Sequence, residues 1–173
     1  MGNTKHISNI MDEELYQEQI LDHYRHPRHK KVMEGATCKA QGNNPMCGDE
    51  VTVFIDIVGD TNDVIGGTKG GKRNKNRVNQ LTFTGHGCAI SQAAASLVVE
   101  SLQGKTMEVI KKLQDKEVLG LLGIPITATR MKCALLIYKT LQQGVKKYES
   151  ENKGSKNANT QKQTKTKIKV GKN

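Results

Sequence analysis

Two segments of the chain, residues 50–58 and 78–84, alternate between apolar and polar side chains. This period of two predicts half-buried β-strands. Four aliphatic side chains share one face of the first segment: Val51, Val53, Ile55 and Ile57. Residues 30–44 predict an irregular link or a short first strand, and the glycine-rich stretch at about 59–77 predicts a long, mobile hairpin loop. The strands on either side of that loop should therefore pair antiparallel.

Other segments carry apolar residues three or four positions apart, which predicts helices. Their expected ranges are 12–26, 89–103, 106–114, 115–123 and 127–148. The first begins at Asp12, a favourable N-cap residue, and stops at Pro27. Its apolar face should consist of Leu15, Ile20 and Tyr24, with Tyr16 and Leu21 beside them. Thr127 should cap the last helix. We expect an α+β fold in which a small antiparallel sheet packs against several helices.

The composition predicts one domain, residues 12–149, between two flexible ends. Residues 1–11 have no periodic pattern. Residues 150–173 consist almost entirely of Lys, Asn, Thr, Gln and other polar residues, and they cannot bury enough apolar surface to repay the entropy of ordering. We expect this tail to be disordered.

The net charge of +10 belongs mainly to the tail and the loop. Residues 152–173 contain seven lysines and no acid, and residues 66–77 contain five basic residues and no acid. The rest of the chain holds slightly more acidic than basic residues. With no tryptophan and two phenylalanines available for base stacking, no specific nucleic-acid partner is expected.

The apolar runs are too short for a membrane protein, because none approaches the roughly 20 residues that span a bilayer. Residues 1–14 also lack the apolar segment of a secretory signal. We therefore expect a cytoplasmic protein without a membrane partner. Thiols stay reduced in the cytoplasm, so the four cysteines should be ligands or reactive thiols rather than disulfides.

The segment Asn44-Pro45-Met46-Cys47-Gly48-Asp49 places a thiol and a carboxylate two residues apart at the start of a strand. Two groups at this spacing can point at one ion across a tight turn. Gly48, between them, removes the Cβ that would crowd the ion. The segment predicts half of a metal site.

Two further cysteines lie near predicted helix starts. Cys88 follows Gly85 and Gly87 at a strand-to-helix turn, where free amides and the helix dipole should favour its thiolate. Cys133 follows Lys132, whose positive charge should also favour a thiolate. The candidate ligands, called the ligand set below, are Cys47, Asp49, Cys88 and Cys133. We expect them to converge on one metal or iron–sulfur site.

Other residues have simpler interpretations. Cys38 is expected to be a small buried side chain, with a spare thiol near the site as the alternative. His23, His26 and His29 lie around the end of the first helix. They could form a metal cluster, but solvated histidines that complement the helix dipole are the more common case.

The chemistry of three thiolates and a carboxylate leaves two kinds of site open. One is a closed tetrahedral zinc site, and the other is the ligand set of a [2Fe–2S] cluster. The carboxylate is a harder ligand than a thiolate, so Asp49 should make one corner more exchangeable. That property suits a protein that must release what it holds.

Three blocks of sequence resemble the signature blocks of the NifU/IscU/SufU-type iron–sulfur assembly scaffolds. They are residues 44–49, the segment Gly85-His86-Gly87-Cys88-Ala89-Ile90-Ser91 and the segment Arg130-Met131-Lys132-Cys133-Ala134. The resemblance covers roughly residues 14–148 with the blocks in the family's order. It implies a SufE/NifU-like fold, an antiparallel sheet packed by helices, with the site at one exposed end.

The resemblance further implies a scaffold, not an enzyme, that binds iron and builds a transient [2Fe–2S] cluster on the ligand set. Sulfur would arrive as persulfide from a cysteine desulfurase, with Cys133 or Cys47 as acceptor, and the cluster would pass to recipient apo-proteins. Lys132, Arg130, Gly48 and Gly87 would be auxiliary residues. The expected oligomeric state is a monomer or a weak homo-oligomer.

Several features of the chain differ from the family's pattern, and these differences leave other functions open. The second and third blocks resemble the SufU branch, whose members hold zinc and relay sulfur, but the insertion those proteins carry between Cys88 and Cys133 is absent. Lys132 stands where IscU proteins have histidine. A zinc-bound sulfur acceptor that activates the desulfurase is therefore a second hypothesis. A structural zinc module that binds other macromolecules is a third.

Overall fold

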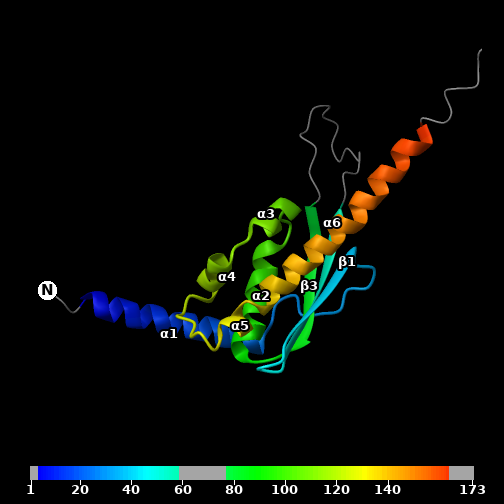
Figure 1. Ribbon diagram of the computed structural model, residues 1–173. Coiled ribbons are helices and arrows are strands. Elements are labelled where there is room, and N and C mark those ends of the chain that lie inside the picture. The colour runs from blue at the N-terminus through cyan, green and yellow to red at the C-terminus, as the bar shows by residue number, and fades with distance from the viewer. Residues whose placement is uncertain (1–3, 59–76, 164–173) are drawn as a thin grey trace, which may run out of the picture.

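The computed structural model describes residues 4–58 and 77–163 of the chain, and its side chains between residues 14 and 152. Within these ranges the protein has one three-stranded antiparallel sheet and six helices (Figure 1). The predicted α+β fold class is confirmed. Almost all of the predicted loop at about 59–77 and the last residues of the predicted tail lie outside the described residues.

The sheet brings the cysteine-containing segments to one end. Its strands are β1 (Cys38–Asn44), β2 (Asp49–Val58) and β3 (Arg77–His86), in the order β1-β2-β3. Asn44 pairs with Asp49, and Glu50 pairs with His86. The turn between β1 and β2 therefore lies beside the point where the chain leaves β3. The first two sequence blocks meet at this end of the sheet.

Six helices accompany the sheet in the described part of the chain. They are α1 (Thr4–Arg25), α2 (Ala89–Leu102), α3 (Met107–Lys112), α4 (Asp115–Leu122), α5 (Met131–Ala134) and α6 (Leu136–Gln163). Helix α2 packs against β3, and α6 packs against β1 and β2. Helix α1 lies along α2 at one end and projects away from the sheet at the other (Figure 1). None of the helices described combines the length and the apolar character needed to cross a bilayer.

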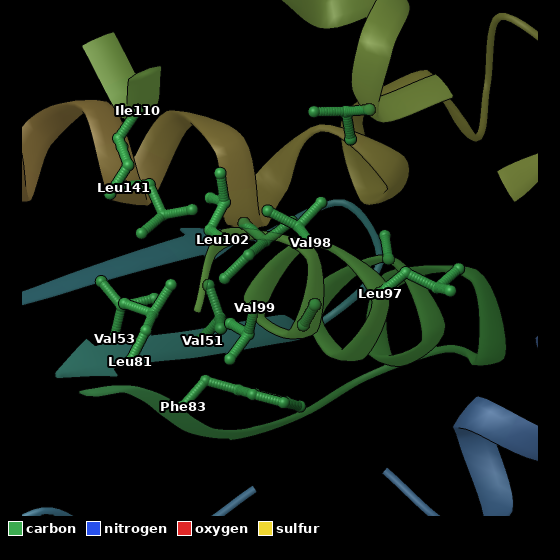
Figure 2. Packing of buried hydrophobic residues seen from close by; sticks show 14 of the residues in the cluster. Val51, Val53, Leu81, Phe83, Leu97, Val98, Val99, Leu102, Ile110 and Leu141 are labelled. Atoms are coloured by element: carbon green, nitrogen blue, oxygen red, sulfur yellow. The ribbon is translucent and has the colours of Figure 1, made fainter. Parts of the chain in front are cut away.

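The core lies between the sheet and the two helices that pack on it. Figure 2 shows Val53, Leu81 and Phe83 of the sheet near Val99 and neighbouring residues of α2, with Ile110 of α3 and Leu141 of α6 above them in this view. All four aliphatic residues predicted to share one face of β2 are buried. Burying each such side chain contributes about 1.5–3 kcal/mol, so this layer holds the sheet end that carries the cysteine segments in place.

The first helix differs from its prediction. Helix α1 begins at Thr4, so Asp12 lies inside it and is not its N-cap, because residues 4–11 contain no proline or glycine to stop the helix. It ends at Arg25, before Pro27, as expected. Of the predicted apolar face only Ile20 is buried. Four of its members are exposed: Leu15, Tyr16, Leu21 and Tyr24. Among the described side chains of α1 only His23 is buried besides Ile20, so the buried face is narrower than predicted.

The last predicted helix is two helices. Helix α5 ends at Ala134, and α6 begins at Leu136 and continues to Gln163, past the predicted end at 148. Thr127 does not cap it, because the N-cap residue of α5 is Arg130 and the Thr127 hydroxyl bonds to Thr129. The residues after 148 contain no proline, and helical hydrogen bonds need no apolar partner, so a polar segment can extend an existing helix.

Candidate metal centre

Cys47 lies in the four-residue turn between β1 and β2 and is exposed. Its backbone N–H donates to the Asn44 carbonyl across 3.2 Å, which closes the turn. Gly48 follows with φ +66°, a left-handed conformation that favours glycine. No heavy atom lies within 4 Å of the position that its Cβ would take. The left-handed backbone conformation is by itself a reason for glycine at position 48, and the expectation that Gly48 avoids crowding a bound ion stays a prediction.

Asp49 is completely buried at the start of β2. Its Oδ1 accepts the backbone N–H of Cys88 across 2.8 Å, and its Oδ2 accepts the side-chain amide of Asn44 across 3.4 Å. These bonds offset part of the cost of burying a carboxylate. Gly87 makes room for the carboxylate, since a Cβ at that position, with φ +155°, would lie 2.5 Å from Asp49 Oδ1. Gly87 is therefore required by the close approach of the Asp49 side chain, which the sequence did not predict.

Cys133 is completely buried in α5, and its Sγ lies 3.2 Å from the Sγ of Cys47. The Asn44 amide that bonds to Asp49 also reaches the Cys133 Sγ across 3.4 Å. Candidate ligand atoms of Cys47, Asp49 and Cys133 all lie within 4.8 Å of one another. We call these three residues the centre. Two bonds of about 2.3 Å from sulfur to one zinc ion span a similar distance, so the donor atoms fit a single ion.

Burial raises the pKa of the Cys133 thiol above its ordinary value, and the neighbouring Asp49 carboxyl and Cys47 thiol raise it further. Lys132 does not oppose this effect, because its Nζ points to the exposed Met46 sulfur at 3.4 Å. The expectation that Lys132 favours a Cys133 thiolate in the free protein is wrong. A metal would have to displace the thiol proton on binding.

Cys88, the fourth member of the ligand set, is the N-cap residue of α2 and is partly exposed. It lies at the predicted strand-to-helix turn. Its thiol is not one of the groups within the centre, although its backbone N–H donates to Asp49. The structure therefore brings three of the four predicted ligands together. The fourth, Cys88, is connected to Asp49 by its backbone N–H.

Arg130 and Lys132 lie within three residues of Cys133 in the chain, and both are exposed. The Arg130 carbonyl accepts the backbone N–H of Cys133 across 3.0 Å, which positions the thiol through the backbone of α5. The sequence patterns did not predict Asn44 as a hydrogen-bond donor to the centre. Its position as the first residue of the Asn-Pro-Met-Cys-Gly-Asp block was the signal that could have indicated this role.

The remaining cysteine and histidines lie apart from the centre. The Cys38 thiol is buried and donates to the Gly144 carbonyl across 3.1 Å, and burial raises its pKa. This confirms the expected small buried side chain. His23 is buried against Ser96, and His26 is exposed beside Asp22. In the described residues no group of three ligating side chains includes these histidines.

Thiol and carboxylate donors in this arrangement suit zinc or iron. A structural zinc site is closed by four ligands, whereas this one has an exposed thiol at Cys47. A buried carboxylate held by two donors, a buried thiol and an exposed thiol allow metal binding and also access by an external reactant.

The chain matches the family model described as the NifU-like N terminal domain at residues 15–69 and 71–155. It is 32% identical over 155 residues to the zinc-dependent sulfurtransferase SufU of Bacillus subtilis, a match that covers 80% of this chain and 94% of that protein. It is 30% identical over 149 residues to the iron–sulfur cluster assembly scaffold protein IscU of Thermotoga maritima, covering 77% and 94%.

Solved structures agree with these matches. A candidate iron–sulfur cluster assembly scaffold protein for the SUF system from Fervidobacterium islandicum AW-1 superposes with a TM-score of 0.55 at 26% identity, covering 74% of this chain and 94% of that one. The N-terminal part of a NifU-like protein from Brucella abortus gives a TM-score of 0.57 at 16% identity, covering 82% and 97%, and supports the fold alone. The resemblance drawn from the three sequence blocks is confirmed.

Proposed function

Because the chain belongs to the NifU-like N-terminal domain family, whose matched relatives include iron–sulfur cluster assembly scaffolds, we propose that it assembles a transient [2Fe–2S] cluster on the ligand set. The cluster is cargo that the protein builds and hands on. A cysteine desulfurase would supply the sulfur, and apo iron–sulfur proteins would receive the product.

The observation that carries the proposal is the convergence of Cys47, Asp49 and Cys133 within 4.8 Å. Thiolates are the usual protein ligands of iron–sulfur clusters. Cys88 would complete the ligand set by turning its thiol toward the centre, because its own amide is already bonded to Asp49 across 2.8 Å.

Cys47 is the proposed sulfur acceptor, because it is exposed whereas Cys133 is buried. Its thiolate would attack the outer sulfur of the desulfurase persulfide. A new S–S bond forms on Cys47, the S–S bond of the donor breaks, and the desulfurase cysteine leaves as a thiolate. Cys133, 3.2 Å from Cys47, is placed to hold the delivered sulfur or the iron that joins it.

Asp49 would make release easier than a fourth thiolate would. A carboxylate is a harder ligand and binds iron or zinc less tightly than a thiolate does. Asp49→Cys, which puts a fourth thiolate in place of the carboxylate, should therefore release the bound metal or cluster more slowly than the unaltered protein. Equal or faster release from that variant would contradict the lability argument.

A zinc-bound sulfur acceptor that activates the desulfurase is the second candidate function. The 32% identity to the Bacillus subtilis protein named a zinc-dependent sulfurtransferase favours it. In this case zinc would hold Cys47 until the partner docks and frees the thiolate as a nucleophile. A structural zinc module, the third hypothesis, does not require the exposed thiol of Cys47.

Anaerobic reconstitution separates the first two functions. Protein purified without oxygen is incubated with iron, cysteine and a desulfurase, and charge-transfer absorption is followed in the visible range. A cluster that forms, and then activates an apo-protein, supports the scaffold. Stoichiometric retained zinc, no cluster and a faster desulfurase would support the sulfur acceptor instead.

Cys38→Ser is the matched control for these assays. Its hydroxyl can still donate to the Gly144 carbonyl, and it lies outside the centre. This variant should retain the metal content and the activity of the unaltered protein. Loss of metal from it would show that Cys38 is a ligand.

A further inference from the structure

Ser91 is a buried polar residue whose hydroxyl lacks a partner in the described part of the chain. The residue is 4% exposed, and its Oγ makes no hydrogen bond there. It lies in the first turn of α2, three residues after Cys88. A buried hydroxyl without a partner costs about 1–3 kcal/mol, so such a group calls for an explanation.

The Ser91 hydroxyl and the Asp49 carboxylate border the same small space. A Cβ built on Gly87 would lie 2.6 Å from Ser91 Oγ and 2.5 Å from Asp49 Oδ1. Because glycine has no Cβ, Gly87 places no side-chain atom in the space between Ser91 and Asp49. A hydroxyl donor and a carboxylate acceptor face each other across this gap.

The two oxygens of Asp49 have different surroundings. Oδ2 lies on the thiol side, because the Asn44 amide that bonds to it also reaches the Cys133 sulfur. Oδ1 lies on the α2 side, where it accepts the amide of Cys88. If Asp49 binds a metal beside the thiols, Oδ2 is the oxygen placed to do so, and Oδ1 is left to the groups of α2.

We propose that Ser91 is a positioning residue for the Asp49 ligand, and that its hydroxyl donates to Oδ1 when Oδ2 binds a metal ion. Small rotations of the two side chains across the Gly87 gap would close the bond. This inference rests on the proposed function, since it requires Asp49 to be a ligand. The proposed hydrogen bond gives the Ser91 hydroxyl a partner in the metal-bound protein.

The physical effect concerns metal binding rather than folding. A second hydrogen bond to Oδ1 holds the Asp49 carboxylate in one orientation. Metal binding at Oδ2 then costs less conformational entropy. Removing such a supporting hydrogen bond typically lowers metal affinity about 10- to 100-fold. In the metal-free protein, the same removal takes away an unpaired buried hydroxyl and should not lower stability.

The test compares Ser91→Ala with Ser96→Ala. Both serines are buried on α2, but the Ser96 hydroxyl is bonded to His23 and to the backbone of Arg28. Affinity for Zn²⁺ is measured by chelator competition, and unfolding of the metal-free proteins by urea. Ser91→Ala should bind Zn²⁺ at least about tenfold more weakly with unchanged metal-free stability. Ser96→Ala should show the opposite pattern.

A double-mutant cycle with Asp49→Ala adds a second readout. Ser91→Ala should cost little further Zn²⁺ affinity once Asp49 is gone, because the two residues act together. The visible spectrum of bound Co²⁺ should change in Ser91→Ala and stay unchanged in Ser96→Ala. Equal effects of Ser91→Ala with and without Asp49 would overturn the proposed bond.

The outcomes separate this inference from the proposed function. Zn²⁺ affinity that falls in Asp49→Ala but not in Ser91→Ala would overturn the role of Ser91 alone. If the unaltered protein fails to bind Zn²⁺, or Asp49→Ala binds it equally well, both the role of Asp49 as a ligand and the inference fall. Metal-free stability that drops in Ser91→Ala with unchanged Zn²⁺ affinity would assign Ser91 a structural role.

Discussion

Two buried polar networks meet on α2, and they differ in how completely their groups are paired. In the first, called the His23 network, the Ser96 hydroxyl accepts the backbone N–H of Arg28 and bonds to His23 Nδ1, each across 2.8 Å. The other ring nitrogen of His23, Nε2, faces Glu100 at 4.0 Å. The network joins α1 and its following turn to α2.

The second network, called the Asp49 network, surrounds the Asp49 side chain and lies near the N-terminus of α2. Both carboxylate oxygens have donors, but the Ser91 hydroxyl lacks a partner among the described residues, and two thiols lie 3.2 Å apart. Cys47 leaves one side of this network exposed. The complete network should serve folding, and the incomplete one should serve binding, because unpaired donors and acceptors retain the capacity to hold a ligand.

The largest expected effect is that of Cys133→Ser on metal binding. Removal of a thiolate ligand should lower Zn²⁺ affinity by more than the roughly 100-fold upper range for supporting residues. Chelator competition measures this, with Cys38→Ser as the control that should keep its metal. Affinity in Cys133→Ser within a few-fold of the unaltered protein would remove Cys133 from the ligand set.

Gly87→Ala should disturb the Asp49 network through the backbone. The new Cβ would lie 2.5 Å from Asp49 Oδ1 and would require a backbone conformation that L-residues rarely adopt. Such strain costs about 1–3 kcal/mol of unfolding free energy. The control is Gly120→Ala in α4, where nothing lies within 4 Å of the new Cβ, and where the helix should gain about 0.5–1 kcal/mol. Urea unfolding distinguishes the two, and a neutral Gly87→Ala would contradict the close packing at this position.

Ser96→Ala should damage the His23 network alone. It leaves the buried His23 Nδ1 and the Arg28 backbone N–H without their partner, which costs about 1–3 kcal/mol. Thermal or urea unfolding of the metal-free protein measures the loss, and Zn²⁺ affinity should not change. A shift in metal affinity as large as that expected for Ser91→Ala would mean that the two networks are not separate.

The smallest effect is a pH dependence from His23. Burial lowers the pKa of His23 below its ordinary 6.5, with the Arg28 charge acting in the same direction. The unfolded chain therefore binds a proton at a higher pH than the folded one, so the contribution of His23 is fully present above about pH 6.5 and is lost as the pH falls below it. Unfolding free energies at a series of pH values should show this slope in the unaltered protein.

Two histidine variants isolate the cause. His23→Gln should lose this part of the pH dependence, because glutamine does not titrate. His26→Gln, at an exposed histidine beside Asp22, should retain it. The same slope in His23→Gln would assign the dependence to another group.

Much of the fold and two of the three residues of the centre could be predicted from local patterns. The alternation in residues 50–58 predicts which aliphatic side chains of β2 face the core, because successive side chains of a strand point to opposite faces. Pro27 marks the end of α1, since proline cannot continue the helix. The thiol and the carboxylate at Cys47 and Asp49 are neighbours on a tight turn whatever the rest of the chain does. These features depend on residues close together in the sequence.

Other features were decided only by tertiary contacts. Cys133 lies 86 residues beyond Cys47, and nothing local shows that its thiol is buried with a raised pKa while the Lys132 side chain points away. Asn44 became a donor to both Asp49 and Cys133 only because β1 pairs with β2 beside α5. Burial and pairing of polar groups depend on the whole packed structure, because solvent is removed by neighbours that are distant in the chain. Local sequence patterns therefore identify the residues with metal-binding side chains, whereas the packing of distant segments establishes which of their atoms face one another.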